Sequence, residues 1–140
     1  MKRVVIAVAA VLLGLGGYAA WFSRQRIHNF GNKNVSYEVV NTEATRQRGL
    51  SGRTSLPVDR AMLFVFDTPG EQCFWMKDMR FDLDMIWLDK GKKVVHIERA
   101  VTPSSYPASF CADMAAKYVI EVNAGMAQQA GVHVGSQLSF

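Results

Sequence analysis

The chain has 140 residues and a mass of 15.6 kDa, which is enough for one domain with a hydrophobic core. Hydrophobic residues make up 49% of it and charged residues 20%, which excludes a disordered or low-complexity protein. The formal net charge is +4, but the basic surplus lies before Asn34, and the rest of the chain is close to neutral. Nucleic-acid binding needs a basic face to neutralise phosphates. The charge distribution therefore argues against a nucleic-acid partner.

Residues 4–22 form an uninterrupted apolar run after Lys2 and Arg3. As a helix this run would be about 28 Å long, close to the thickness of a membrane's hydrocarbon core. A cleaved signal peptide has a shorter apolar region that ends in small residues, and Gly17-Tyr18-Ala19 is a candidate cleavage site. The length of the run favours an uncleaved anchor, and a cleaved signal remains the alternative.

The basic residues on the two sides of this run nearly balance, so charge alone does not predict its orientation. Cys73 and Cys111 are the only cysteines, and an even number in an exported small domain predicts a disulfide. Two buried free thiols are the alternative. A disulfide would favour an oxidising compartment, so we expect the C-terminal domain at the cell membrane on its outer side, or secreted if the N-terminus is cleaved.

Three segments follow in the predicted organisation: a transmembrane anchor or signal at 1–23, a linker at 24–34, and an extracytoplasmic domain at 35–140. Alternating apolar residues predict a strand at 35–40, and the apolar run at 62–66 predicts another. A further short strand is predicted at 72–76. Between the first two, Asn41 or Thr42 can cap a short helix that reaches Arg48, with Gly49 after its end. Pro69-Gly70 marks a turn.

In the second half of the domain, the sequence predicts a hairpin of residues 83–88 and 94–101. A long loop at 102–115 follows, which a disulfide at Cys111 would hold in place. A strand follows at 118–122, a short helix runs from a cap at Asn123 to Gly131, and a last strand covers 137–140. The predicted fold class is α+β and β-rich, a small twisted barrel or sandwich with two short helices. One N-terminal transmembrane or signal helix would precede it.

Several segments together resemble an uncharacterised bacterial and archaeal family, domain of unknown function 192. The matching segments are Arg48-Gly49-Leu50 with Arg53 and Leu56, Met62-Leu63-Phe64-Val65-Phe66, Phe74-Trp75-Met76-Lys77-Asp78-Met79, Leu83-Asp84-Met85-Ile86, and Val119-Ile120-Glu121-Val122 with Ala124-Gly125. The resemblance covers about residues 35–140. It implies a β-rich fold and no established activity.

The polar and aromatic positions of these segments are the candidate ligand-binding residues: Arg48, Arg53, Trp75, Lys77 and Asp84. Side chains alternate along a strand, so Trp75 and Lys77 should share one face while Met76 points to the other. A tryptophan beside a cation is a platform for a sugar ring or a carboxylate-bearing ligand. The structural alternative places Trp75 in the core, with Lys77 or Arg53 paired to Asp84.

The sequence gives weaker support for two other kinds of site, a hydrolase site and a metal site. Asp82 and Asp84 would lie on one strand face about 7 Å apart, opposite a core-facing stripe, and could form a two-carboxylate hydrolase site. Exposed acids on alternate positions are more often a solvated face. A Cu(I) site using Cys73, Met76 and Met79 is disfavoured, because a strand would point these residues to opposite faces. We therefore expect no metal and no cofactor.

The leading functional hypothesis is a non-enzymatic, membrane-tethered extracytoplasmic domain that binds a small molecule, an envelope glycan or a protein partner. The alternatives are an envelope-directed hydrolase that uses Asp82 and Asp84, and a purely structural envelope component. The sequence does not decide whether there is catalysis, although it favours binding. It also does not name the ligand.

Overall fold

A computed structural model describes residues 27–140. The anchor or signal predicted at 1–23 lies outside the described residues. Within the described part of the chain, no helix is long and apolar enough to cross a membrane. The described residues form one mixed six-stranded sheet, in the order β1-β2-β3-β8-β5-β6, and a separate two-stranded ribbon, β4-β7.

The strands and helices occupy the following residues. The sheet contains β1 (Ile27–Phe30), β2 (Lys33–Val40), β3 (Arg60–Gly70), β5 (Leu83–Leu88), β6 (Val94–Val101) and β8 (Ala116–Asn123). The ribbon consists of β4 (Cys73–Trp75) and β7 (Ser109–Cys111). The helices are α2 (Glu43–Arg48), the 3-10 turn η1 (Pro103–Ser105) and α3 (Met126–Gln129).

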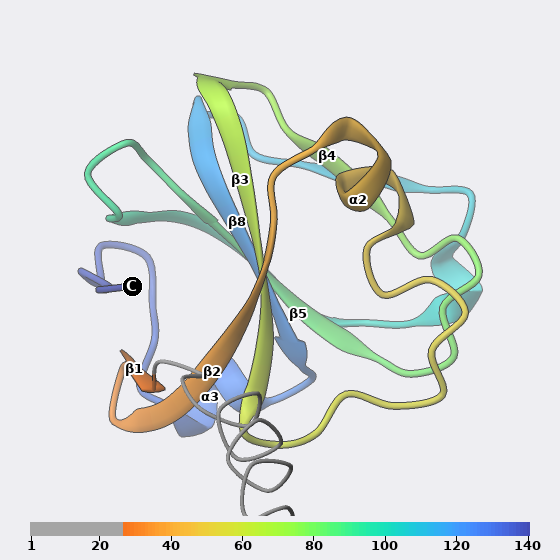
Figure 1. Ribbon diagram of the computed structural model, residues 1–140, viewed down its shortest axis with the longest axis horizontal. Helices are drawn as coiled ribbons and strands as arrows, with labels where there is room; N and C mark the ends of the chain where they lie inside the picture. The colour runs from red at the N-terminus through yellow and green to blue at the C-terminus, as the bar shows by residue number, and fades with distance from the viewer. Residues whose placement is uncertain (1–26) are drawn as a thin grey trace, which may run out of the picture.

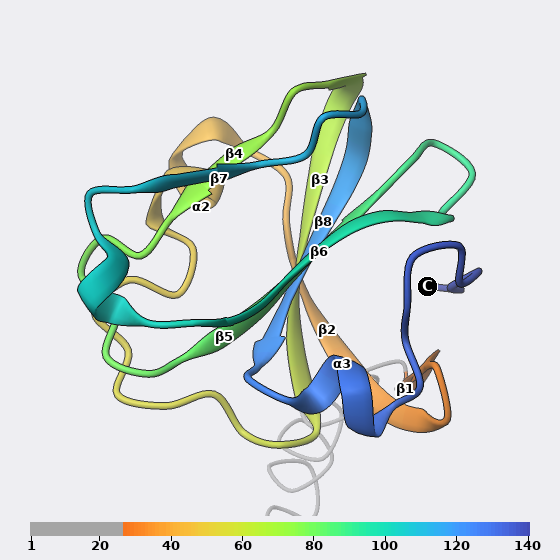
Figure 2. The same ribbon diagram turned by 180° about the vertical axis from the view of Figure 1, so that it is seen from behind.

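The sheet is strongly twisted and is covered on both faces, as Figures 1 and 2 show. One face packs under α3 and the C-terminal residues, and Phe30 of β1 is buried in the same core. The other face packs under α2 and the β4-β7 ribbon. The β-rich class, the twisted sheet and the two short helices are confirmed. Within residues 27–140, β1 and β6 do not pair with each other, so the sheet is open rather than a closed barrel.

The pairing of β2 with β3 determines where α2 lies. These two strands are parallel, while all other neighbours in the sheet are antiparallel. A parallel pair needs a crossover connection that passes over one face of the sheet. Residues 41–59 form this crossover and contain α2. The helix is therefore placed above the face on which Met62 and Phe64 of β3 are buried.

The N-terminus of α2 agrees with the sequence prediction. Thr42 is the N-cap, and its hydroxyl accepts a hydrogen bond from the Thr45 backbone amide at 3.2 Å. The Thr45 hydroxyl in turn accepts one from the Thr42 amide at 3.1 Å, which completes a reciprocal cap. Gly49 follows the helix with a φ of +47°, in the left-handed region that glycine adopts without strain.

Several predicted boundaries are wrong. Part of the predicted linker forms β1, which pairs with β2 and buries Phe30. Residues 137–140 make only one isolated bridge, from Gln137 to Lys93, rather than a strand. Helix α3 is capped by Gly125 instead of Asn123, whose side-chain amide donates to the Leu56 carbonyl at 2.8 Å. The predicted Pro69-Gly70 turn is the end of β3.

The predicted disulfide between Cys73 and Cys111 is present. The two cysteines are direct partners in the β4-β7 ribbon, with their Cα atoms 4.3 Å apart. The region expected as a loop at 102–115 therefore contains η1 and β7. Trp87 of β5 ties the ribbon to the sheet, because its indole N–H donates to the Gln72 carbonyl at 2.7 Å.

Asp84 lies inside the domain, which contradicts the predicted solvated face on β5. Every residue of β5 is buried, and Asp84 is 0% exposed. Its carboxylate accepts hydrogen bonds from the backbone amides of Ala100 and Ala127, each at 3.0 Å. Ala100 lies where the β5-β6 register shifts, and Ala127 lies in the first turn of α3. Asp84 thus joins the β6 irregularity to α3.

Replacing Asp84 with asparagine should destabilise the domain. The amide offers one acceptor oxygen for two N–H groups, one buried and one partly buried, so one donor loses its partner, at a cost of about 1–3 kcal/mol. Asp82 is exposed outside the strand, so Asp82→Asn should change the free energy of unfolding by less than about 0.5 kcal/mol. Urea unfolding followed by tryptophan fluorescence measures both. Equal stability of the two variants would contradict this role of Asp84.

Candidate functional site

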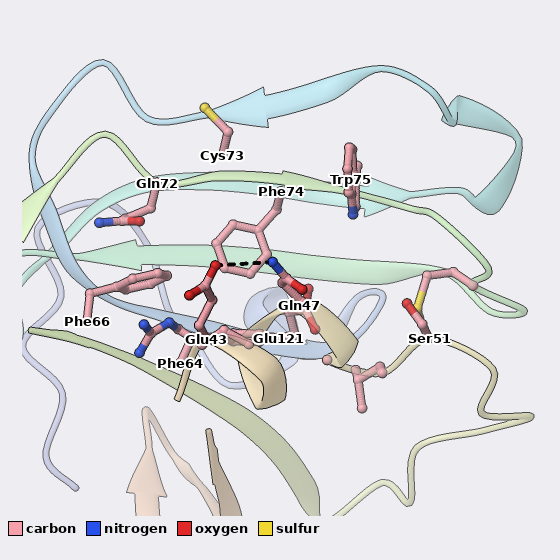
Figure 3. A pocket seen from close by; sticks show the side chains of 14 residues that line it. Glu43, Gln47, Ser51, Phe64, Phe66, Gln72, Cys73, Phe74, Trp75 and Glu121 are labelled. Atoms are coloured by element: carbon pink, nitrogen blue, oxygen red, sulfur yellow. Dashed lines mark hydrogen bonds between the residues drawn. The ribbon is translucent and has the colours of Figure 1, made fainter. Parts of the chain in front are cut away.

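A cavity of about 280 Å³ lies between α2, β3 and β4, over the sheet face that carries Phe64. Figure 3 shows side chains from β4 reaching toward α2 across this space. The cavity is lined by Glu43, Arg46, Gln47, Gly49, Leu50, Ser51, Phe64, Phe66, Gln72, Cys73, Phe74, Trp75, Met79 and Glu121. Most of the apolar lining is aromatic, and the charged lining residues are Glu43, Arg46 and Glu121.

Glu121 is the buried polar group of this cavity. It lies on central strand β8, directly between Met62 of β3 and Met85 of β5. Only 5% of its surface is exposed. No group within residues 27–140 donates a hydrogen bond to its carboxyl or forms an ion pair with it. A buried carboxyl without a protein partner is unusual, because desolvation of a polar group is costly.

Burial raises the pKa of Glu121 to about 8. The cause is desolvation, which disfavours the charged carboxylate, and no neighbouring positive charge offsets it. At neutral pH most molecules therefore carry a protonated Glu121. A neutral carboxyl can both donate and accept a hydrogen bond. The ionised carboxylate can only accept, and it places a negative charge among apolar side chains.

Aromatic rings bound the cavity on two sides. Phe74 of β4 meets Phe64 at a centroid distance of 4.8 Å and an interplanar angle of 90°, and meets Phe66 at 6.4 Å and 86°. The edge-to-face arrangement fixes these rings at right angles to one another. Trp75 extends the aromatic surface to the rim and is 53% exposed.

Helix α2 supplies the polar side of the cavity. The Arg46 guanidinium donates to the carbonyls of Asn41 and Val65 at 2.7 and 2.9 Å, and it lies 5.1 Å from the centre of the Phe66 ring. Gln47 donates to the carboxylate of Glu43 one turn earlier, as the dashed line in Figure 3 shows. The ribbon disulfide does not enter the cavity, since the Cys73 sulfur points away toward β7 (Figure 3).

The structure brings Trp75 and Lys77 together, as the alternation predicted. The Lys77 ammonium lies 6.0 Å from the centre of the Trp75 ring, and Met76 between them is buried. Lys77 itself is in a turn after β4, and its carbonyl accepts a hydrogen bond from the Ser51 hydroxyl at 2.9 Å. Trp75 lines the cavity, so the interpretation of Trp75 as a core residue is wrong.

Arg48 and Arg53 lie at a different place, in a groove on the other side of the 49–53 segment. Arg53 forms an ion pair with Glu38 of β2, with one N–O distance of 2.8 Å. A side-chain hydrogen bond from Arg53 lowers the pKa of Glu38. The expected pairing of Lys77 or Arg53 with Asp84 is therefore wrong. Of the five candidates, only Trp75 lines the aromatic cavity.

Sequence reasoning missed Glu121 as a site residue, although the segment that contains it carried part of the family resemblance. The available signal was an acidic residue inside the apolar run Val119-Ile120-Glu121-Val122. In a strand buried on both faces, an acid has no solvated side to occupy. Its place on the cavity side of the sheet depends on the long-range pairing of β8 with β3 and β5.

A model of the family DUF192, described as "Uncharacterized ACR", matches residues 25–140, and the chain belongs to this family. No curated protein matches the chain.

Two solved structures show the same fold. One is a candidate transcription regulator from Sinorhizobium meliloti 1021, with a TM-score of 0.72 and 28% identity, covering 76% of this chain and 81% of that one. The other is a protein of unknown function from Novosphingobium aromaticivorans, with a TM-score of 0.73 and 26% identity, covering 77% and 76%.

The raised pKa of Glu121 predicts a pH-dependent stability. The folded state holds its proton more tightly than the unfolded state does, so this stabilising contribution is complete below about pH 4.5. It is lost as the pH rises through about 8, with a slope approaching 1.4 kcal/mol per pH unit at most. Glu121→Gln should remove this slope and be the more stable protein at pH 8. Urea unfolding from pH 4.5 to 9 tests this, and parallel curves for the two proteins would contradict it.

Proposed function

We propose that the protein is a small-molecule-binding domain whose ligand enters the aromatic cavity and contacts Glu121. The observation that carries this proposal is a buried carboxyl without a protein partner in an open, aromatic-lined cavity. Ligand sites are typically concave and apolar, with a few polar groups that orient the ligand. We further propose that residues 4–22 tether the domain to the membrane on its outer side, which the Cys73–Cys111 disulfide supports.

Binding is favoured over the hydrolase alternative because of how the carboxyl groups are used. Asp84 is buried and its two oxygens accept backbone hydrogen bonds, so it is not available to a substrate. Asp82 is exposed and lies before β5 begins. A two-carboxylate mechanism needs both carboxyl groups accessible in one pocket, where they flank the scissile bond. This pair does not meet that requirement.

Nucleic acid is not the proposed partner. One structural relative is described as a candidate transcription regulator. From Asn34 onward this chain carries eleven basic and twelve acidic side chains, which leaves no surplus for phosphate contacts. The cavity also has two acids and one base among its charged lining residues.

The binding proposal predicts that a bulky side chain at the cavity rim blocks ligand uptake. Gln47 and Ala44 are both exposed on α2, but only Gln47 lines the cavity. A metabolite and glycan library is screened against the full chain by thermal shift, and hits are measured by calorimetry. Gln47→Trp should weaken the hits by about tenfold or more, while Ala44→Trp should bind as the wild type does. The absence of any hit, or equal binding by both variants, would contradict a ligand site in this cavity.

The tether proposal predicts that the protein stays with membranes and that its C-terminus lies outside the cytoplasm. An alkaline phosphatase fused after Phe140 should be active, because this enzyme needs an oxidising compartment for its own disulfides. The fusion should remain in the membrane pellet after a carbonate wash. An inactive fusion would overturn the orientation, and release of a shortened domain would support a cleaved signal in place of the anchor.

A further inference from the structure

We propose that the ligand of this cavity is an organic cation, a substituted ammonium with apolar groups around its nitrogen, and that Glu121 is its counter-ion. This inference rests on the proposed function and adds the chemical class of the ligand. Three features carry it. The Glu121 carboxyl has no hydrogen-bond partner in the described part of the chain, the aromatic rings that line the cavity are perpendicular to one another, and Arg46 is bonded to backbone carbonyls rather than to Glu121.

The surroundings of Glu121 leave its negative charge unsatisfied. Its neighbours across both strands are Met62 and Met85, which are 1% and 0% exposed. Neither side chain offers a strong hydrogen bond or a charge. A ligand that brings a positive charge to this carboxylate gains Coulomb energy in a site of low effective dielectric, where such a contact is worth more than in water.

The aromatic walls suit a cation with an apolar surface. Phe64 and Phe66 each lie perpendicular to Phe74, so the rings present faces and edges in different directions around the cavity. Ring faces attract cations, and proteins recognise quaternary ammonium groups with several aromatic side chains around one site. The Phe66 ring already accepts a cation, since the Arg46 guanidinium lies 5.1 Å from its centre.

Arg46 does not neutralise Glu121. Its guanidinium donates to the carbonyls of Asn41 and Val65, and it forms no ion pair within the described part of the chain. Glu43 adds a second carboxylate on the α2 side of the cavity. A bare metal ion would need several oxygen ligands close together, and a single buried carboxyl does not provide them. A substituted ammonium needs only one counter-ion and the rings.

Binding of a cation is linked to the proton on Glu121. The charged groups that face the cavity are Glu43 and Arg46, both on α2, while β3, β4 and β5 present aromatic, sulfur-containing or uncharged side chains there. A cationic ligand requires the ionised carboxylate, so it must displace the proton that Glu121 holds at neutral pH. The affinity for a cationic ligand should therefore rise with pH. It should level off above the pKa at which Glu121 loses its proton in the unliganded protein.

The test compares choline with 3,3-dimethylbutan-1-ol, an uncharged compound of the same shape, by calorimetry on the full chain in a non-ionic detergent. At pH 8.5 choline should bind about tenfold or more tightly than the alcohol. At pH 5.5 choline should bind at least about tenfold more weakly than at pH 8.5. Glu121→Gln should remove both the preference for choline and its pH dependence. Asp82→Asn removes an exposed carboxylate that does not line the cavity, so it should keep both.

Equal binding of the two compounds, or a preference for choline that survives in Glu121→Gln, would overturn the cation inference and leave a ligand site in the cavity. Failure of both compounds to bind at millimolar concentration would also overturn it. The proposed function is tested by a different result. It fails if the library screen yields no ligand whose binding Gln47→Trp weakens. Because Glu121→Gln is expected to be more stable than the wild type at pH 8.5, lost choline binding in that variant at this pH would not reflect unfolding.

Discussion

Strand β8 lies in the middle of the sheet and is covered on both faces, so its side chains must be apolar or must find partners. Ile120 and Val122 pack into the core under α3, and Val119 packs into the core under α2. Glu121 shares the second face with Val119 and finds no partner among residues 27–140. The opening between α2 and β4 lies over this one position. A central strand that is covered on both faces thus carries the residue that the proposed ligand would reach.

Two parts of the fold, helix α2 and the β4-β7 ribbon, enclose the cavity above one face of the sheet. The parallel pairing of β2 and β3 carries the crossover helix α2 over this face. The disulfide and the Trp87 hydrogen bond hold the β4-β7 ribbon on the opposite side of the opening. Asp84 acts on the other face, where it fixes α3 and the β6 irregularity. The two acids of the central strands therefore differ: Asp84 accepts two backbone hydrogen bonds, whereas Glu121 has no hydrogen-bond partner in the part of the chain that the structure describes.

Local patterns in the sequence predicted β2 to β6 and β8, the α2 cap at Thr42 and the Cys73–Cys111 disulfide, because each depends on neighbouring residues or on a simple count. They missed β1 and β7, which are short strands in segments expected as a linker and a loop. They also predicted that Trp75 and Lys77 lie close together, although Lys77 is in the turn after β4 rather than in the strand. The burial of Asp84 was not predictable from alternation, because β5 has strands on both sides and cores on both faces. The role of Glu121 was missed for the same reason. Both depend on which strands become neighbours, and this information is spread over the whole chain.

The position of β8 also sets the order in which the domain can assemble. Its partners β3 and β5 precede it along the chain, so they remain without their shared neighbour until residues 116–123 have been made. Contacts between such distant segments form slowly, because a long loop must close first. During synthesis β3 and β5 therefore expose apolar edges that can pair with other chains. A chain cut short before Ala116 would lack the strand that joins the two halves of the sheet, and it would be prone to aggregate rather than fold.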